Sequence, residues 1–236
     1  FEAQALALPY LQADDVVQIG GKPDLAPHRR LATKAVIGPG TGLGVGSLIR
    51  TSDRWIPLAG EGGHVDLGPR TAKDHKFWPF IETVEGRVSA EQALSGQGLI
   101  NLYTAIATSS GEGIEHHSAA AISKAAFAGS DPMAEAAIDV FCELLGRIAG
   151  DLALVTLPKG GVYLSGGISQ KLETFLPNSK FRQAFEDKAP NRKLLESIPT
   201  YLVKNAESAL LGLESYARNP DHFDDSVNDQ SWHLTV

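Results

Sequence analysis

The chain has 236 residues, of which 43% are hydrophobic and 21% charged, and its formal net charge is −7. These values are typical of a globular protein, and the acidic balance argues against sequence-independent nucleic-acid binding, which requires clustered Lys and Arg. A single cysteine, Cys142, excludes an intrachain disulfide and a Cys-rich zinc site and favours a reduced, cytoplasmic setting, and no apolar run reaches the roughly 18 residues of a membrane span.

Short strands are predicted for the first third of the chain, after an initial helix over residues 1–11. Residues 15–20 read as a strand, and apolar runs split by Gly and Pro continue to about residue 69, which indicates a β-rich block. Within this block, glycines occupy every second position from Gly38 to Gly46. The flanking runs predict a strand–turn–strand hairpin with Gly40-Thr41-Gly42 at its tip.

Helices are predicted for most of the remaining chain. The expected segments are residues 74–86, a helix capped by Ser89, residues 98–111, a long helix from Asp131 to Leu157, and residues 208–219. Asp131 is a good N-cap and Pro132 suits the first helical position. A strand within residues 160–168 precedes the last helix, so the order of elements favours an α/β or α+β fold. The polar, acidic residues after 218 are expected to form a loosely attached tail.

The glycine-rich tip fits neither common nucleotide fingerprint. No Lys follows the glycines as in a Walker loop, and no helix follows them as in a dinucleotide-binding turn. Main-chain amides at such a tip can still converge on an anionic oxygen, and the Thr41 hydroxyl adds a donor. The alternative is a glycine-rich hairpin that binds no ligand.

A second glycine turn, Ser165-Gly166-Gly167, lies between a predicted strand and a helix. Glycine lets a ligand approach the backbone closely, so the base and ribose of a nucleotide could lie flat against this turn. Alone, the turn is a weak indication of a ligand. Together, the two glycine turns suggest a nucleotide held between two halves of a domain.

Glu61 and His64 lie three residues apart in a glycine-rich bend, from which both side chains can enter one cleft. Their spacing is not the i, i+4 pattern of a zinc pair, so no metal site is predicted. Asp66 could orient His64 if this segment is a strand, because residues two apart share a face. The alternative is a solvated turn with a locally hydrogen-bonded histidine.

Glu91, at the start of the helix expected after Ser89, has two interpretations. It could be a first-turn glutamate stabilised by the helix dipole, or a second carboxylate that binds a polyhydroxyl ligand through strong, charge-assisted hydrogen bonds. His116 and His117 have no evident third metal ligand and are interpreted as part of a solvated loop. Cys142 is interpreted as a small core side chain.

Several motifs, in order along the chain, resemble the bacterial ATP-dependent glucokinases of the hexokinase and actin-like superfamily. They are GPGTGLGVG, WIPLAGEGGHVDLGP, GRVSAEQALSGQGLINLY, GGVYLSGGI and FRQAFEDK. The similarity extends from Phe1 to about Arg218, and several long motifs in order are far more specific than a lone glycine pattern. A related family of sugar kinases and repressors carries a Cys-rich zinc motif, for which this sequence lacks the cysteines.

The resemblance implies a ribonuclease-H-like α/β fold with a mixed sheet and flanking helices. Residues 1–218 would be the large C-terminal domain of a glucokinase, beginning with a fragment of the interdomain helix, and residues 219–236 an acidic tail. Glucose would be the substrate, and ATP and Mg²⁺ the cofactors. A homodimer is a family expectation, while neither a nucleic acid nor a membrane is expected as a partner.

The resemblance also implies roles for single residues. Gly40, Thr41 and Gly42 would hold the phosphates of ATP, and Gly166 and Gly167 would lie near its adenosine. The family's glucose-binding positions match Glu61, His64 and Glu91, in that order along the chain. His64 and Glu61 would fix the anomeric side of the sugar, and Glu91 a nearby hydroxyl.

One departure from the family concerns the general base. In these glucokinases an Asn-Asp pair immediately precedes the F-x-A helix, and its Asp takes the proton from the 6-hydroxyl of the sugar. This sequence starts at Phe1, just after that position, so no catalytic residue is assigned within it. A positioned base contributes roughly 10²- to 10⁴-fold to the rate. We therefore expect the parent protein to phosphorylate glucose and this stretch alone to be inactive.

Two other functions remain open at this point. A sugar-binding regulator of the same fold would need no catalytic base, although the sequence offers no helix-turn-helix candidate. A glycoside hydrolase could use Glu61 and Glu91 as acid and base, but that function leaves the glycine hairpins unexplained.

Overall fold

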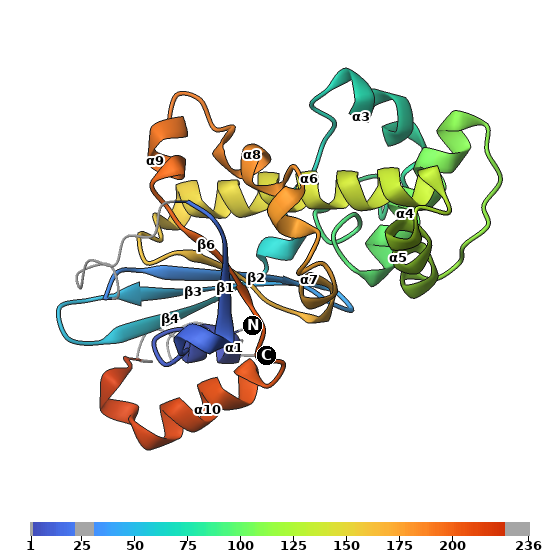
Figure 1. The fold of residues 1–236 in the computed structure, drawn as a ribbon. Coiled ribbons are helices and arrows are strands. Elements are labelled where there is room, and N and C mark those ends of the chain that lie inside the picture. The colour runs from blue at the N-terminus through green and yellow to red at the C-terminus, as the bar shows by residue number, and fades with distance from the viewer. Residues whose placement is uncertain (1, 22–30, 225–236) are drawn as a thin grey trace, which may run out of the picture.

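A mixed sheet of six strands forms the centre of the computed structural model, which describes residues 2–21 and 31–224 (Figure 1). The strand order is β1-β6-β5-β2-β3-β4. Strands β2, β5 and β6 run parallel to one another, while the β2–β3, β3–β4 and β1–β6 pairs are antiparallel. The strands are β1 Val16–Gly20, β2 Lys34–Pro39, β3 Leu43–Arg50, β4 Trp55–Gly60, β5 Val162–Leu164 and β6 Thr200–Val203. The expected mixed sheet with flanking helices is confirmed.

Helices cover both faces of this sheet. The α-helices of the described residues are α1 Glu2–Ala7, α3 Ala72–Phe77, α4 Gly96–Ser110, α5 Ala119–Ala128, α6 Pro132–Thr156, α7 Gly167–Lys171, α8 Phe181–Glu186, α9 Arg192–Glu196 and α10 Ser208–Arg218. Helix α6 runs across one face, and α1 and α10 lie on the other, while α3, α4 and α5 extend beyond the sheet at one end (Figure 1). No helix in residues 2–21 or 31–224 is long and apolar enough to cross a membrane.

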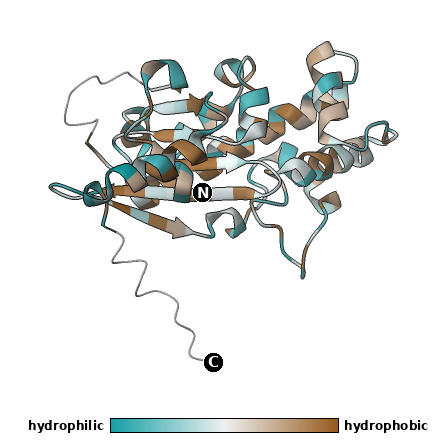
Figure 2. Cartoon of the chain, turned by 90° about the horizontal axis from the view of Figure 1, so that it is seen from below, coloured by the Kyte–Doolittle hydropathy of each residue, from teal (hydrophilic) through white to brown (hydrophobic). Residues whose placement is uncertain are grey.

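Two hydrophobic cores follow from the alternation of side chains along β2. Ala35 and Ile37 belong to the larger core, which includes the buried side of α6. Val36 points to the opposite face, where it joins the smaller core with Leu48 and residues of α1. Because successive strand residues face opposite sides, one fully buried strand can serve both cores. In Figure 2, brown hydrophobic segments recur along the strands, between white and teal ones.

The long helix α6 begins and ends where the sequence predicts. Asp131 is its N-cap and accepts a hydrogen bond from the Met133 amide at 2.7 Å, and Pro132 is its first residue. Leu157, in the left-handed conformation with φ 46°, ends it. Cys142 is fully buried in its middle, as expected, and burial raises the pKa of its thiol to about 12. A thiol held neutral in this way is a packing group and not a nucleophile.

The helix predicted after Ser89 is wrong. The amides of Ala90 and Glu91 donate to the carbonyls of Val65 and Gly63, at 2.9 and 2.8 Å, so residues 90–95 form turns instead. Ser95 is the true N-cap of α4, since its hydroxyl accepts from the Gly98 amide at 2.9 Å. The helix expected over residues 98–111 is present as α4, whereas contacts distant in sequence replace the separate helix expected after Ser89.

Other boundaries also differ from the prediction. Pro79 interrupts the helix expected over residues 74–86, so α3 ends at Phe77 and a 3₁₀ turn, Trp78–Phe80, follows. The bend after Gly60 contains a 3₁₀ turn, Gly62–His64, and no strand. The sequence interpretation assigned neither strand β6 nor helix α5.

The first residues of the expected loose tail are attached to the domain. Phe223 is 4% exposed in the smaller core, and the Asp224 amide donates to the Trp55 carbonyl at 2.8 Å. An aromatic side chain that reaches an apolar core anchors an otherwise polar segment. The rest of that predicted tail, residues 225–236, lies outside the described residues, as does Phe1.

Candidate functional site

The predicted hairpin is present, and its tip is three residues long. Pro39 and Leu43 form the last pair of the β2–β3 ladder, so Gly40, Thr41 and Gly42 form the connection. The Gly40 amide donates to the Gly42 carbonyl at 2.7 Å, which closes the turn. Within residues 2–21 and 31–224, the amides of Thr41 and Gly42 have no recorded hydrogen bond. The tip therefore offers two main-chain donors and the exposed Thr41 hydroxyl.

Glu91 lies against this tip. Its Oε2 accepts a hydrogen bond from the Leu43 amide at 2.8 Å. A Cβ added to Gly42 would collide with the same carboxylate, so a larger residue there would displace the Glu91 side chain. The start of α4 adds a second link, because the Gly96 amide donates to the Gly40 carbonyl at 2.9 Å.

Glu61 and His64 lie on the neighbouring bend, directly after β4. Gly63 packs so closely on the Leu43 carbonyl that no side chain would fit. The side chains themselves are open to solvent, 90% exposed for Glu61 and 53% for His64, and the His64 Nε2 is 3.9 Å from the Glu61 Oε2. The bend is fixed by its backbone, which leaves both side chains free to bind a ligand.

Asp66 was expected to orient His64, but its side chain binds Arg87 instead. Its Oδ1 accepts from the Arg87 Nε at 2.9 Å, and the Arg87 Nη2 donates to the His64 carbonyl at 2.8 Å. Arg87 thereby connects the bend to the segment that leads to Glu91. Sequence reasoning missed this residue because no local pattern joins two groups 21 positions apart.

The second glycine turn lies beside the end of β2. Gly166 has φ 86°, which only glycine adopts readily, and a Cβ at this position would lie 2.6 Å from the Pro39 carbonyl oxygen. The Ser165 amide donates to the Ile37 carbonyl at 2.9 Å. Gly167, in contrast, has open space where a side chain would be. The two glycine turns thus adjoin at one edge of the sheet.

His116 is more firmly held than a solvated loop would allow. Its Nε2 is 3.3 Å from the Asp131 Oδ2, and its ring lies 5.7 Å from the ring of Tyr103. His117 is exposed, as expected. Among the described residues no group of three or more His, Cys, Asp or Glu side chains could hold a metal ion.

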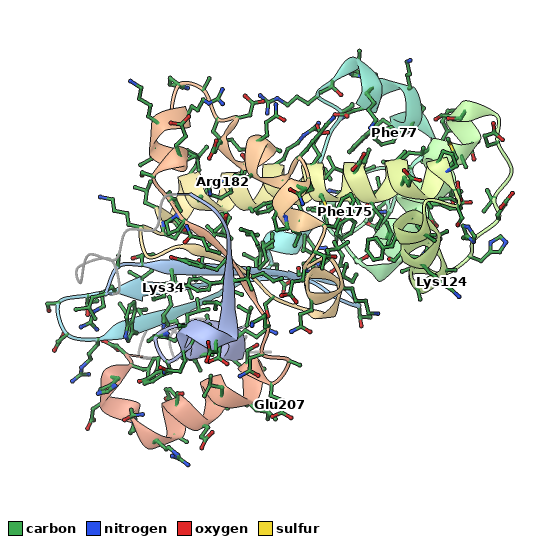
Figure 3. The ribbon with its side chains drawn as sticks, in the orientation of Figure 1. Lys34, Phe77, Lys124, Phe175, Arg182 and Glu207 are labelled. Atoms are coloured by element: carbon green, nitrogen blue, oxygen red, sulfur yellow. The ribbon has the colours of Figure 1, made fainter. Side chains whose placement is uncertain are left out.

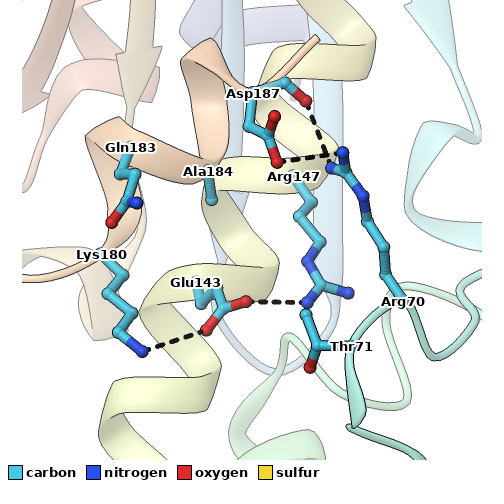
Figure 4. A pocket seen from close by; sticks show the side chains of 8 residues that line it. All are labelled: Arg70, Thr71, Glu143, Arg147, Lys180, Gln183, Ala184 and Asp187. Carbon is cyan, nitrogen blue, oxygen red and sulfur yellow. Dashed lines mark hydrogen bonds and ion pairs between the residues drawn. The ribbon is translucent and has the colours of Figure 1, made fainter. Parts of the chain in front are cut away.

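A cavity of about 280 Å³ between α3, α6 and α8 contains none of the predicted site residues (Figure 4). The Arg147 Nη2 donates to Asp74 at 2.7 Å and to Glu143 at 2.8 Å, and Arg70 pairs with Asp187 at 2.9 Å. Burial alone would raise the pKa of Asp74, but hydrogen bonds from Arg70, Thr71 and Arg147 hold it below the ordinary value. These contacts join three helices and serve stability.

The mixed sheet, with two glycine turns adjoining at the end of its central strand, defines an α/β protein of the actin-like ATPase class. A family model described as Glucokinase matches residues 1–220, and the chain belongs to this family.

Comparisons with individual proteins agree. The glucokinase of Rhizobium etli is 50% identical over 232 residues, which cover 98% of this chain and 67% of that protein. A glucokinase crystal structure from an Antarctic psychrotroph has a TM-score of 0.84 at 34% identity, covering 93% of this chain and 67% of its own. A Balamuthia mandrillaris glucokinase in complex with glucose shares the fold, with a TM-score of 0.73 at 23% identity over 91% of this chain and 63% of its own. The chain thus spans about two thirds of these relatives.

Proposed function

We propose that this chain forms the glucose- and ATP-binding part of an enzyme that transfers the terminal phosphoryl group of ATP to the 6-hydroxyl of glucose. The observation that supports this most is the contact between Glu91 and the glycine tip. It brings a residue predicted to bind the sugar next to a turn predicted to bind phosphate, as a direct transfer between two substrates requires.

On the sugar side, Glu61, His64 and Glu91 would bind glucose hydroxyls. Carboxylates are strong acceptors for hydroxyl donors, and each such charge-assisted bond contributes about 1.5–3 kcal/mol. The Oε2 of Glu91 already accepts from Leu43, so its Oε1 would take the sugar hydroxyl. This division would leave the glycine tip in place while the sugar binds.

On the nucleotide side, the amides of Thr41 and Gly42 and the Thr41 hydroxyl would donate to the phosphates. The backbone at Gly166 and Gly167 would lie along the adenosine. Because the described residues form no cage of metal ligands, Mg²⁺ would enter bound to the phosphates of ATP, whose charge it neutralises.

The resemblance implies that the general base is an Asp immediately before Phe1. An Asp there would take the proton of the 6-hydroxyl as the hydroxyl oxygen attacks the phosphorus. The same resemblance supports a homodimer located in the cytoplasm. Sedimentation of the parent protein is the direct test of the oligomeric state.

The test is glucose-dependent formation of ADP by the parent protein with ATP and Mg²⁺, beside calorimetric binding of glucose. Glu91→Gln should weaken glucose binding about 10- to 100-fold, because one charge-assisted hydrogen bond is lost. Glu112→Gln, at an exposed carboxylate beyond the end of α4, is the matched control and should bind as the wild type does.

The alternative, a sugar-binding regulator without catalysis, makes a different prediction. It would bind glucose through the same residues but form no ADP under any of these conditions. Absence of ADP formation with glucose, mannose and fructose would end the kinase proposal, whereas unchanged glucose affinity in Glu91→Gln would end the assignment of that residue.

A further inference from the structure

A cavity of about 520 Å³ lies on the α1 side of the sheet, at the opposite end of β2 from the glycine tip. The five steps of β2 from Lys34 to Pro39 separate these two ends by about 17 Å. The cavity walls include Leu8, Leu11, Val16, Lys34, Tyr163 and Tyr201. None of the residues assigned to glucose or ATP lines it, so it is a separate site.

Strand register explains why these side chains meet. Val36 pairs with Tyr163, and Tyr163 pairs with Tyr201, across the parallel strands β2, β5 and β6. Paired residues share a face, and Lys34 lies two positions before Val36 on that face. The two tyrosine rings stack with centroids 4.9 Å apart and an interplanar angle of 26°. The cavity therefore has a flat aromatic wall with one amine beside it.

Lys34 is the unusual member of this wall (Figure 3). The residue is 4% exposed, and among the cavity-lining residues that the structure describes it is the sole ionic side chain. Its Nζ lies 5.7 Å from the centre of the Tyr163 ring, and no ion pair or hydrogen bond to another described residue is recorded for it. An ammonium group buried without a counter-ion is costly to the folded state.

Burial has the expected effect on this amine. It lowers the pKa of Lys34 to about 8, because desolvation penalises the charged form. The titratable groups that face it are the phenols of Tyr163 on β5 and Tyr201 on β6, and the segment from Leu8 to Val16 adds none among the lining residues. Burial raises the pKa of Tyr163, so that phenol stays neutral while Lys34 titrates.

We propose that this cavity binds a small amphipathic monoanion, namely a carboxylate attached to an aromatic or compact apolar body. The carboxylate would pair with the Lys34 Nζ and supply the missing counter-ion. The apolar body would lie against the stacked tyrosines and the leucine side chains. This inference is independent of the proposed glucose phosphorylation.

The probes are benzoate, cyclohexanecarboxylate and the neutral analogue benzyl alcohol, each titrated calorimetrically into the chain. Both carboxylates should bind, and benzyl alcohol should bind about 10- to 100-fold more weakly, because it lacks the charge that pairs with Lys34. Above the lysine pKa of about 8, benzoate affinity should fall about tenfold for each pH unit, and binding should take up protons.

Two substitutions separate the charge from the shape of the site. Lys34→Met should lose benzoate binding to the level of benzyl alcohol, and Lys34→Arg should restore part of it. Lys124→Met, at an exposed position on α5, is the matched control and should leave binding unchanged. Glucose binding should be the same in all three variants.

Several results would overturn the proposal. They are the absence of binding by both carboxylates, equal affinity for benzyl alcohol and benzoate, and unchanged benzoate binding in Lys34→Met. If Lys34→Met fails to fold, the pH series on the unmodified chain decides, since an affinity that does not change with pH excludes pairing with this amine.

Discussion

Strand β2 starts at Lys34 and leads into the glycine tip at Gly40, and charged groups are held in different ways at its two ends. Beside the tip, Glu61 and His64 are largely exposed, and main-chain contacts at glycines fix the segment that carries them. At the other end, Lys34 is buried among apolar and aromatic side chains. An exposed charge costs the fold little, whereas a buried, unpaired one costs much. Substitutions of the exposed side chains beside the tip should therefore change ligand binding more than stability, whereas substitutions of Lys34 should change stability as well as ligand binding.

The largest expected effect tests the role of the backbone in the bend that carries Glu61 and His64. Gly63→Ala would push a methyl group into the Leu43 carbonyl, so we expect a loss of about 2–4 kcal/mol in the free energy of unfolding. Gly60→Ala, three residues earlier, has open space for its methyl group and should change stability by less than about 0.5 kcal/mol. Denaturant unfolding measures both, and equal values would show that the close contact does not hold the bend.

The next effect is a gain of stability at Lys34. Replacing this lysine by Met removes an amine whose pKa falls from 10.5 in the unfolded chain to about 8 in the folded one. The folded state binds fewer protons, so the penalty is complete below pH 8 and disappears as the pH rises to 10.5. Lys34→Met should therefore gain up to about 3 kcal/mol at neutral pH. Unfolding followed as a function of pH would contradict this if the gain did not shrink.

A smaller effect separates the two duties assigned to Glu91. Glu91→Ala leaves the Leu43 amide without its acceptor and should cost about 1 kcal/mol of stability. Glu91→Gln retains an acceptor, so stability should return while glucose binding stays weak because the charge is gone. Parallel unfolding and calorimetric titrations would refute the division of duties if stability and affinity changed together.

The smallest expected effect is at His64. Its side chain is 53% exposed, so His64→Gln should alter the free energy of unfolding by less than about 0.5 kcal/mol. Glucose affinity should nevertheless fall, as the proposed contact with the sugar is lost. A large loss of stability in denaturant would mean that the His64 side chain is packed in the fold and not exposed as described.

Elements with strong local signals were predictable from the sequence. The long helix α6 has its N-cap, proline and apolar repeat within one continuous segment, and the glycine tip between two apolar runs defines β2 and β3. The absence of a helix directly after Ser89 was not predictable, because the amides of Ala90 and Glu91 are used by a bend distant in sequence. Local sequence favours Ser89 as a cap, and tertiary hydrogen bonds override it.

Motifs in the sequence nominate residues for the candidate site, whose roles stay predictions, but they do not show how these residues are connected. Motifs identified Glu61, His64 and Glu91, yet nothing in their spacing shows that Glu91 would hold the tip through Leu43. The role of Arg87 was not predicted because its partners, Asp66 and His64, are distant in sequence and come close only in the folded chain. The Lys34 cavity depends on the register of three strands, of which the sequence interpretation did not assign β6.

Helix α6 connects the sheet with the helical extension. Its 25 residues span about 37 Å, and along that length it contacts α4 and α5 at one end and β2, α8 and α9 toward the other. Neither the sheet nor the helical extension of α4 and α5 buries its apolar surface without this helix. The sheet and the helical extension should therefore lose their structure together, as one cooperative unit.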